Sequence, residues 1–221
     1  SVTLNSVSND GNKPVITANN QNYTFDAVLY ATGRRPNTTN IGLENTDITT
    51  NERGAIVVND TCESSVPGVY AVGDVNGGPQ FTYISLDDFR IVFGALTGNG
   101  HYTLKDRKNI PYTTFLTPPL ARVGFTEEEA INNGYTVKTK EMLVATMPRA
   151  HVNDNLKGAF KIVVDAESNL ILGATLYSQS AEELINMIKV AMDNNIPYTY
   201  FKNQIFTHPT MAENLNDLCN F

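Results

Sequence analysis

The sequence predicts an α/β part followed by an antiparallel α+β part. In the first half, short apolar runs such as 27–32 end at glycine. Such runs are typical of strands that are buried on both faces of a parallel sheet. In the second half, paired short strands alternate with amphipathic helices. The charged stretch at 105–111 separates the two patterns, so we expect a boundary there.

The first half contains turn signals and one long apolar segment. Asparagine-rich turns at 9–12 and 19–22 divide the first stretch into strands. Further short strands are expected at 54–60 and in the run that ends at Gly73. The segment 81–98 is compatible with a buried helix that ends at Gly98 and Gly100. The apolar residues expected in that helix are Ile84, Leu86, Phe89, Ile91, Val92 and Leu96.

The second half gives clearer local signals. Two short strands flank the Pro118–Pro119 break, and two more flank a turn at 166–169. A short helix should follow Thr126 as its cap and end at Gly134. An amphipathic helix is expected at 180–195, with Ser180 as its cap. A last helix should begin near Pro209.

Composition excludes several classes of partner. The chain has 221 residues, is 41% hydrophobic and carries a net charge of −7. Without a basic surface, binding to nucleic acid or to an anionic membrane is not expected. No apolar run is long enough to span a bilayer, and we expect a cytoplasmic protein. Cys62 and Cys219 share no short spacing, which favours free thiols, and the sequence offers no set of metal ligands.

The residues Gly73 and Asp74 follow a predicted buried strand. Ligands in open α/β sheets bind beyond such strand ends, where glycine permits close approach and a carboxylate can accept hydrogen bonds from sugar hydroxyls. The next helix begins near Thr82, and its N-terminus could face an electron-rich oxygen. Taken alone, the same residues also fit a tight turn in which Asp74 only forms the turn.

Near the end of the chain, His208 stands five positions before Glu213. The pair could be a histidine base oriented by a carboxylate. It could also be the start of a helix, with Pro209 at the first position and Glu213 in the first turns. The local pattern leaves both interpretations open.

Four motifs occur in the order found in the pyridine nucleotide–disulfide oxidoreductases, the FAD enzymes that include glutathione reductase, dihydrolipoamide dehydrogenase and mercuric reductase. They are ATGRRPN at 31–37, the 54–78 stretch that contains VYAVGDVNGG, FTYISLDD at 81–88 and HPTMAE at 208–213. The chain resembles this family over practically its whole length. Within the family it most resembles bacterial reductases linked to reactive-chlorine and copper stress.

The resemblance implies a domain organisation. Residues 1–25 would be the tail of an NAD(P)-binding domain, and 26–110 the C-terminal part of a Rossmann-like FAD-binding domain. Residues 111–221 would form an interface domain of antiparallel sheet and helices that makes a homodimer. In such an enzyme a hydride passes from NAD(P)H to FAD, and the electrons then reduce a disulfide and finally a small-molecule disulfide or related acceptor.

The resemblance also implies cofactor-binding positions. Asp74 corresponds to the aspartate that binds the ribityl chain of FAD, and Thr82 falls where backbone N–H groups approach the isoalloxazine ring. Gly33 marks the point where the chain re-enters the FAD domain. The implied flavin-site residues are Gly33, Gly73, Asp74, Phe81, Thr82 and Tyr83.

The resemblance gives His208 and Glu213 a catalytic role. His208 would move a proton at the redox disulfide of the partner subunit, and Glu213 would fix the orientation and tautomer of its ring. A cis His208–Pro209 bond is compatible with such a turn.

Departures from the family pattern limit what this chain can do alone. It has neither glycine-rich dinucleotide motif and no CxxxxC pair. We therefore expect the C-terminal part of a longer enzyme, inactive alone and with weak or no FAD binding. Two alternatives stay open, namely a reductase of metal ions or reactive-chlorine products on the same scaffold, and a non-catalytic dimerisation module. The acceptor and the choice between NADH and NADPH are not specified.

Overall fold

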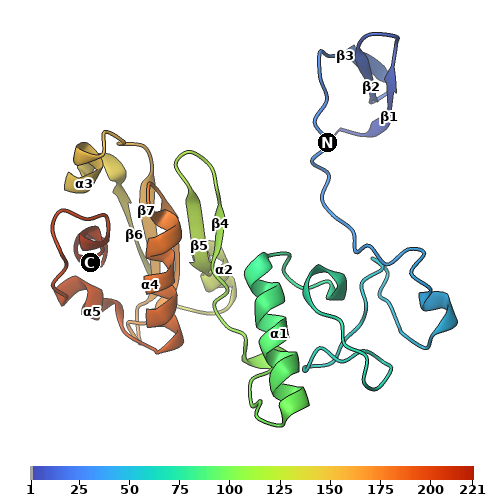
Figure 1. Ribbon diagram of the computed structural model, residues 1–221. Helices are drawn as coiled ribbons and strands as arrows, with labels where there is room; N and C mark the ends of the chain where they lie inside the picture. The colour runs from blue at the N-terminus through green and yellow to red at the C-terminus, as the bar shows by residue number, and fades with distance from the viewer. Residues whose placement is uncertain (1) are drawn as a thin grey trace. The chain divides into compact units, whose positions relative to one another are not determined.

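The computed structural model describes residues 2–221, so Ser1 of the predicted NAD(P)-domain tail lies outside the described residues. The chain forms two compact units, of which the first ends at His101 and the second is Tyr102–Phe221 (Figure 1). The domain limits expected at 25 and 110 stay a prediction. Both sheets pair antiparallel in the part of the chain that the structure describes, and helices accompany them, which confirms a mixed α/β protein.

The first unit begins with a three-stranded sheet. Its strands are β1 (Leu4–Asn9), β2 (Pro14–Ala18) and β3 (Gln21–Thr24), paired in that order. The predicted turns separate them. Asn19 and Asn20 have φ angles of 49° and 62°. A two-residue hairpin turn with positive φ at both positions matches the twist of the flanking strands, and asparagine tolerates that conformation.

The apolar runs that follow do not form the predicted strands. Residues 27–32 are irregular, and the side chain of Leu29 is 89% exposed. The other two runs contain only single bridges, Thr50 with Ile56 and Glu63 with Tyr70. The prediction of strands here was wrong because an apolar run specifies burial but does not supply a neighbouring strand. None of the strands described in the first unit pairs with these runs.

The helix predicted after Phe81 is present as α1 (Thr82–Thr97) and ends at Gly98, whose φ is 72°. It is buried on one face only, through Ile84, Asp88 and Ile91. The segment was predicted to be compatible with a buried helix; the helix is confirmed, and its burial is limited to this face. Its exposed large hydrophobic residues are Tyr83, Leu86, Phe89, Phe93 and Leu96. Two short 3₁₀ turns, η1 (Leu43–Asn45) and η2 (Gly73–Asn76), complete this unit.

The second unit is built on a five-stranded antiparallel sheet with the order β4-β5-β8-β7-β6. The strands are β4 (Tyr112–Thr114), β5 (Leu120–Gly124), β6 (Val137–Leu143), β7 (Ala159–Asp165) and β8 (Ile171–Tyr177). Both predicted strand pairs are confirmed. The edge strand β6 was not predicted, because Lys138, Lys140 and Glu141 interrupt its apolar pattern. Charged residues are common on edge strands, where they discourage pairing with other chains.

Helices surround this sheet. They are α2 (Glu127–Asn132), α3 (Pro148–Val152), α4 (Ala181–Asp193), α5 (Tyr198–Asn203) and α6 (Leu215–Leu218), with the 3₁₀ turns η3 (Leu104–Asp106), η4 (Val144–Thr146) and η5 (Ala212–Asn214). α2 begins after Thr126 and α4 after Ser180, as predicted. Ser180, however, has a φ of 65° and makes no side-chain cap hydrogen bond. The structure also contains α3 and α5, which were not predicted.

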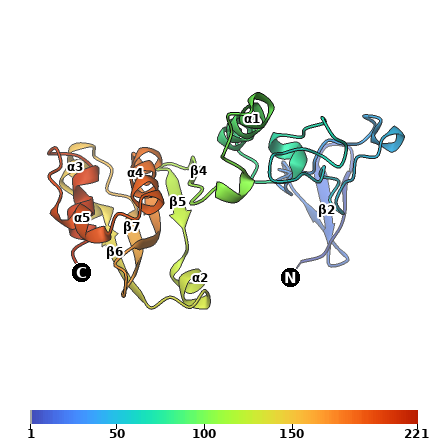
Figure 2. The ribbon, with the colours of Figure 1, turned by 90° about the horizontal axis from the view of Figure 1, so that it is seen from below.

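The core of the second unit lies on both faces of the sheet. Ile162 of β7 joins a large cluster with Ile185 and Ile188 of α4, whereas its neighbour Val163 packs with Ala130 of α2. Successive side chains of a strand point to opposite faces, so α4 and α2 cover opposite sides of the sheet (Figure 2). In the described residues, both buried apolar clusters belong to this unit.

The described helices include none with the length and apolar character needed to cross a bilayer. Across residues 2–221, no three His, Cys, Asp or Glu side chains are grouped so as to hold a metal ion. Cys62 and Cys219 are buried free thiols, as predicted.

Candidate functional site

The segment between α5 and α6 forms a turn rather than the start of a helix. The His208–Pro209 peptide bond is cis, and helical structure begins only with η5 at Ala212. The prediction of a helix beginning near Pro209 was wrong in its position. Thr210 and Glu213 form the pattern of a capping box before this turn. The side chain of each residue accepts a hydrogen bond from the backbone amide of the other.

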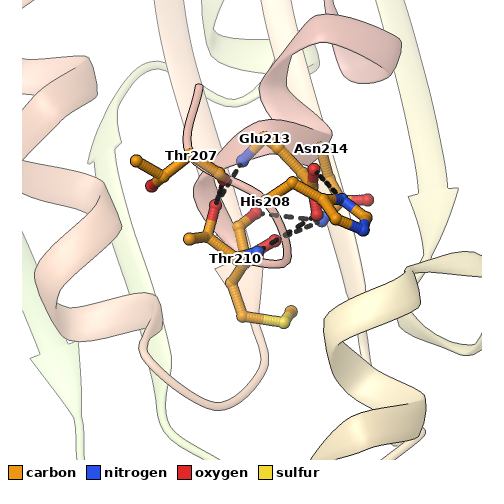
Figure 3. A network of polar contacts seen from close by, with 6 residues as sticks. Thr207, His208, Thr210, Glu213 and Asn214 are labelled. Atoms are coloured by element: carbon orange, nitrogen blue, oxygen red, sulfur yellow. Dashed lines mark hydrogen bonds and ion pairs between the residues drawn. The ribbon is translucent and has the colours of Figure 1, made fainter. Parts of the chain in front are cut away.

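The predicted pair is in direct contact. The Nδ1 atom of His208 lies 2.7 Å from Oε2 of Glu213, and the two side chains are 68% and 18% exposed (Figure 3). An ionised carboxylate only accepts hydrogen bonds, so Nδ1 must carry the proton. In neutral His208 the lone pair is then on Nε2, for which the described residues provide no hydrogen-bond partner. This arrangement leaves an exposed nitrogen that can accept a proton.

Further hydrogen bonds hold Glu213 in place. Its Oε1 atom accepts from the Thr210 amide at 3.1 Å, while its own amide donates to Thr210 Oγ1 at 3.2 Å. The same hydroxyl donates to the Thr207 carbonyl at 2.8 Å. The buried Asn214 side chain donates to the carbonyls of Thr210 and Met211. All these contacts lie within eight consecutive residues.

In the first unit, Gly73 and Asp74 lie in η2, where Gly73 has a φ of 72°. Oδ2 of the fully buried Asp88 accepts from the Gly73 amide at 2.7 Å and from the Asn76 side chain at 2.9 Å. The Asp74 carboxylate is 46% exposed and lies 3.5 Å from Nη1 of Arg34, the residue after Gly33. An exposed carboxylate on a fixed turn can accept hydrogen bonds from the hydroxyls of a ligand.

Asp88 was not predicted as part of the site. One signal was available in the sequence, because Asp88 occupies the helical stripe shared by Ile84 and Ile91, which are buried. A carboxylate on a buried stripe requires hydrogen-bond donors, since burying it without them is costly. Asp88 therefore needs hydrogen-bond donors from another segment. The Gly73 amide and the Asn76 side chain of η2 provide them.

The N-terminus of α1 has the character expected of a flavin contact. Phe81 precedes the helix without a side-chain cap, and the first turn carries no acidic residue. The positive end of the helix dipole is therefore not neutralised by a carboxylate of that turn. The rings of Phe81 and Tyr83 stack with centroids 5.1 Å apart, and burial raises the pKa of Tyr83. The first unit thus carries all six predicted flavin-site residues. Two of its features, the exposed Asp74 carboxylate and the N-terminus of α1, have the chemistry that ligand hydroxyls and an electron-rich ring edge require.

Two sequence models of one family match the chain. The model described as "Pyridine nucleotide-disulphide oxidoreductase" matches residues 1–88. The model described as "Pyridine nucleotide-disulphide oxidoreductase, dimerisation domain" matches residues 110–219. The second match contains both His208 and Glu213.

Curated proteins and solved structures agree with these matches. The chain is 45% identical over 212 residues to the probable pyridine nucleotide-disulfide oxidoreductase RclA of Escherichia coli, covering 96% of this chain and 48% of RclA. It is 35% identical to a mercuric reductase of Staphylococcus aureus, covering 86% of this chain and 35% of that protein. The structure of the HOCl-induced flavoprotein disulfide reductase RclA superimposes with a TM-score of 0.93 at 43% identity, over 98% of this chain and 50% of that one. The chain thus spans about half the length of RclA.

Proposed function

Because the chain belongs to the pyridine nucleotide–disulfide oxidoreductase family, we propose that it is part of an FAD-dependent enzyme that reduces a disulfide or related acceptor with NAD(P)H. The observation that carries the proposal is the 2.7 Å contact between His208 and Glu213 in an exposed turn. The contact leaves Nε2 of the histidine available for proton transfer. We further propose the limits 1–25, 26–110 and 111–221 for the NAD(P), FAD and interface parts, and a cytoplasmic location.

His208 acts in this proposal as an acid and base. Its Nε2 atom accepts the proton of a thiol in the partner subunit, so that the sulfur becomes a thiolate nucleophile. The imidazolium then returns the proton to the reduced acceptor. Glu213 holds the Nδ1–H tautomer throughout and stabilises the positive charge that the ring acquires, as the acidic member of a catalytic triad does.

The first unit contributes to the flavin site. FAD, when bound, would supply the two-electron chemistry that links the nicotinamide to the disulfide. Asp74 would accept hydrogen bonds from the ribityl hydroxyls, and the N-terminus of α1 at Thr82 would face the electron-rich edge of the ring. Gly73 must lack a side chain, because a Cβ atom there would lie 2.6 Å from Oγ of Ser85.

The second unit provides the surface for a homodimer. The match to the family's dimerisation domain supports this part of the proposal. Two large side chains shortly before His208 are exposed, with Ile205 at 95% and Tyr200 at 55%. Apolar side chains of this size lose contact with water when a partner covers them, which favours association. We place the self-association surface at Tyr200 and Ile205, beside the histidine.

The proton-transfer role is tested by His208→Ala in the intact enzyme. Stopped-flow measurements should show acceptor turnover reduced by about 10²–10⁴-fold, while reduction of the flavin by NAD(P)H continues. His151→Ala is the matched control, because the hydrogen bond of its ring within the described residues goes to the Ala145 carbonyl, in a separate segment. An equal loss in both half-reactions would contradict the role.

A second candidate acceptor class is a metal ion or a product of reactive chlorine. The names of the relatives favour it, since they include a mercuric reductase and an RclA described as HOCl-induced, with a Cu(II) complex among its solved structures. Steady-state assays of the intact enzyme with Hg(II), Cu(II) and a small disulfide would separate the two classes. The preferred acceptor should show the highest kcat/KM.

A third candidate is a module that only self-associates. Gel filtration combined with an absorbance scan of this chain tests it. We expect a colourless dimer without NADH oxidation from the chain alone. A yellow protein that oxidises NADH would contradict the proposal that the remaining half of the enzyme is required.

A further inference from the structure

Thr210 uses every polar atom it has within the turn that carries the histidine. Its amide donates to Glu213 Oε1, and its carbonyl accepts from the side chain of Asn214. Its hydroxyl donates to the Thr207 carbonyl and accepts from the Glu213 amide. A hydroxyl has one proton, so this pair of contacts also fixes the direction of the O–H bond.

These contacts join the two residues of the acid–base pair. The Thr207 carbonyl belongs to the peptide unit that leads into His208, and the Glu213 amide belongs to the residue that holds the ring. The Thr210 hydroxyl therefore connects the backbone on both sides of the pair. Its amide separately occupies Oε1 of Glu213, which leaves Oε2 for the histidine.

We propose that Thr210 is a positioning residue that sets the orientation and tautomer of His208 through Glu213. The proposal rests on the acid–base role given to His208 above. Thr210 does not touch the reacting atoms. Its hydroxyl instead fixes the distance between the backbone at Thr207 and the backbone at Glu213. The Glu213 carboxylate is therefore already within hydrogen-bonding distance of the His208 ring. Pre-positioning of this kind matters for catalysis, since a displacement of about 1 Å can cost roughly 100-fold in rate.

The tautomer of His208 provides a readout in this chain without any cofactor. The carboxylate of Glu213 can only accept, so neutral His208 should be protonated at Nδ1. His151 supplies an internal reference of the opposite kind. Its Nε2 atom lies 2.8 Å from the Ala145 carbonyl, which also only accepts, so neutral His151 should be protonated at Nε2. Nitrogen-15 NMR distinguishes the two forms by the shifts of the ring nitrogens.

The experiment compares Thr210→Val with Thr210→Ser. Valine keeps the branched shape and loses both hydroxyl contacts, whereas serine keeps the hydroxyl and loses only a methyl group. We expect T210V to lose the Nδ1–H signature of His208 and T210S to keep it, with His151 unchanged in both. In the intact enzyme, T210V should lower acceptor turnover by up to about 100-fold. Thr210→Ala gives the same readout if T210V does not fold.

A purely structural role for Thr210 predicts a different result. In that case T210V would lower the melting temperature and leave the His208 tautomer as it is in the unaltered chain. That result would overturn the inference while leaving the acid–base role of His208 intact. The acid–base role is tested separately by turnover of H208A, so failure of one proposal can be told from failure of the other.

Discussion

Asp88 and Glu213 are carboxylates that each receive hydrogen bonds from more than one group. Asp88 has no exposed surface and receives the Gly73 amide and the Asn76 side chain. Glu213 receives the His208 ring and the Thr210 amide. The hydrogen bonds of Asp88 connect α1 to η2, which carries Asp74. Those of Glu213 connect η5 to the turn that carries His208. Single buried or half-buried acids thus set the local geometry of both proposed sites.

Replacing Asp88 with asparagine should destabilise the first unit and weaken flavin binding. The amide keeps the shape, but its neutral oxygen is a weaker acceptor than the carboxylate for the two donors that contact Oδ2. We expect a loss of about 1–3 kcal/mol in the free energy of unfolding. Urea denaturation measures this free energy of unfolding, and Asp47→Asn is the control because it makes the same change at an exposed carboxylate. Equal stability of the two variants would contradict the role given to Asp88.

The Cys219 thiol should make stability depend on alkaline pH. Burial raises the pKa of Cys219 from 9.0 to about 12, with Lys140 opposing the shift to a smaller extent. Between these two values the unfolded chain loses the thiol proton and the folded chain keeps it. The contribution of Cys219 is therefore complete below pH 9 and is lost as the pH rises towards 12.

Denaturation curves at pH 8 and pH 10.5 test this prediction. The drop in the free energy of unfolding between the two pH values should be smaller in Cys219→Ser than in the unaltered chain. Thiol reagents at pH 8 should also label the folded chain slowly, because both cysteines are buried. Rapid labelling of Cys219 without unfolding would refute the assignment.

At the level of elements, the helices and hairpins with complete local signals were predicted correctly. Thr126, three glutamates and Gly134 delimit α2, and the turn residues near 19–20 fix the first hairpins. The strands expected at 27–32 and at 54–60 were wrong because such strands depend on neighbours that sequence periodicity does not specify. His208 and Glu213 were predicted from their motif, and the structure brings their side chains into contact. Thr210 was missed because its role arises from contacts that only the folded backbone reveals. Asp88 was missed although its position on the buried stripe of α1 indicated that its carboxylate needs hydrogen-bond donors.

The capping box of α2 should contribute measurably to stability. Thr126 Oγ1 accepts from the Glu129 amide at 3.1 Å, and Glu129 Oε2 accepts from the Thr126 amide at 2.7 Å. Thr126→Ala should lower the free energy of unfolding by about 0.5–2 kcal/mol, and Thr126→Ser should be close to neutral. Urea denaturation of the second unit measures both. A loss in T126S equal to that in T126A would show that the hydroxyl is not the stabilising group.

For the whole molecule, the distribution of buried apolar residues differs between the units. In the described part of the chain, the large core cluster combines strands, helices and the C-terminal segment of the second unit. Lys140 also holds that segment by donating to the carbonyls of Asp217 and Asn220. The first unit leaves Leu29 and the outer face of α1 exposed. We therefore expect the second unit to resist hydrogen exchange longer than the first.

The proposed dimer surface gives a test at the scale of the assembly. Ile205→Asp places a charge where the proposal puts a desolvated contact, so it should shift the gel-filtration elution from dimer to monomer. Ile131→Asp is the matched control, because Ile131 is also exposed but lies on α2, which covers the other face of the sheet. Dissociation by I131D and not by I205D would move the interface to the α2 side.

The hydrogen bonds around His208 join residues at most five positions apart in the sequence, apart from those that anchor α6. Contacts this local close small loops, so their entropic cost is low and is met when a single protomer folds. Immobilising a flexible side chain at an interface costs about 0.5–1.5 kcal/mol of conformational entropy. Because the His208 side chain is already held in the single protomer, little of this cost would remain when two protomers associate. In the proposed homodimer, each subunit would therefore present to its partner a histidine that is already oriented for proton transfer.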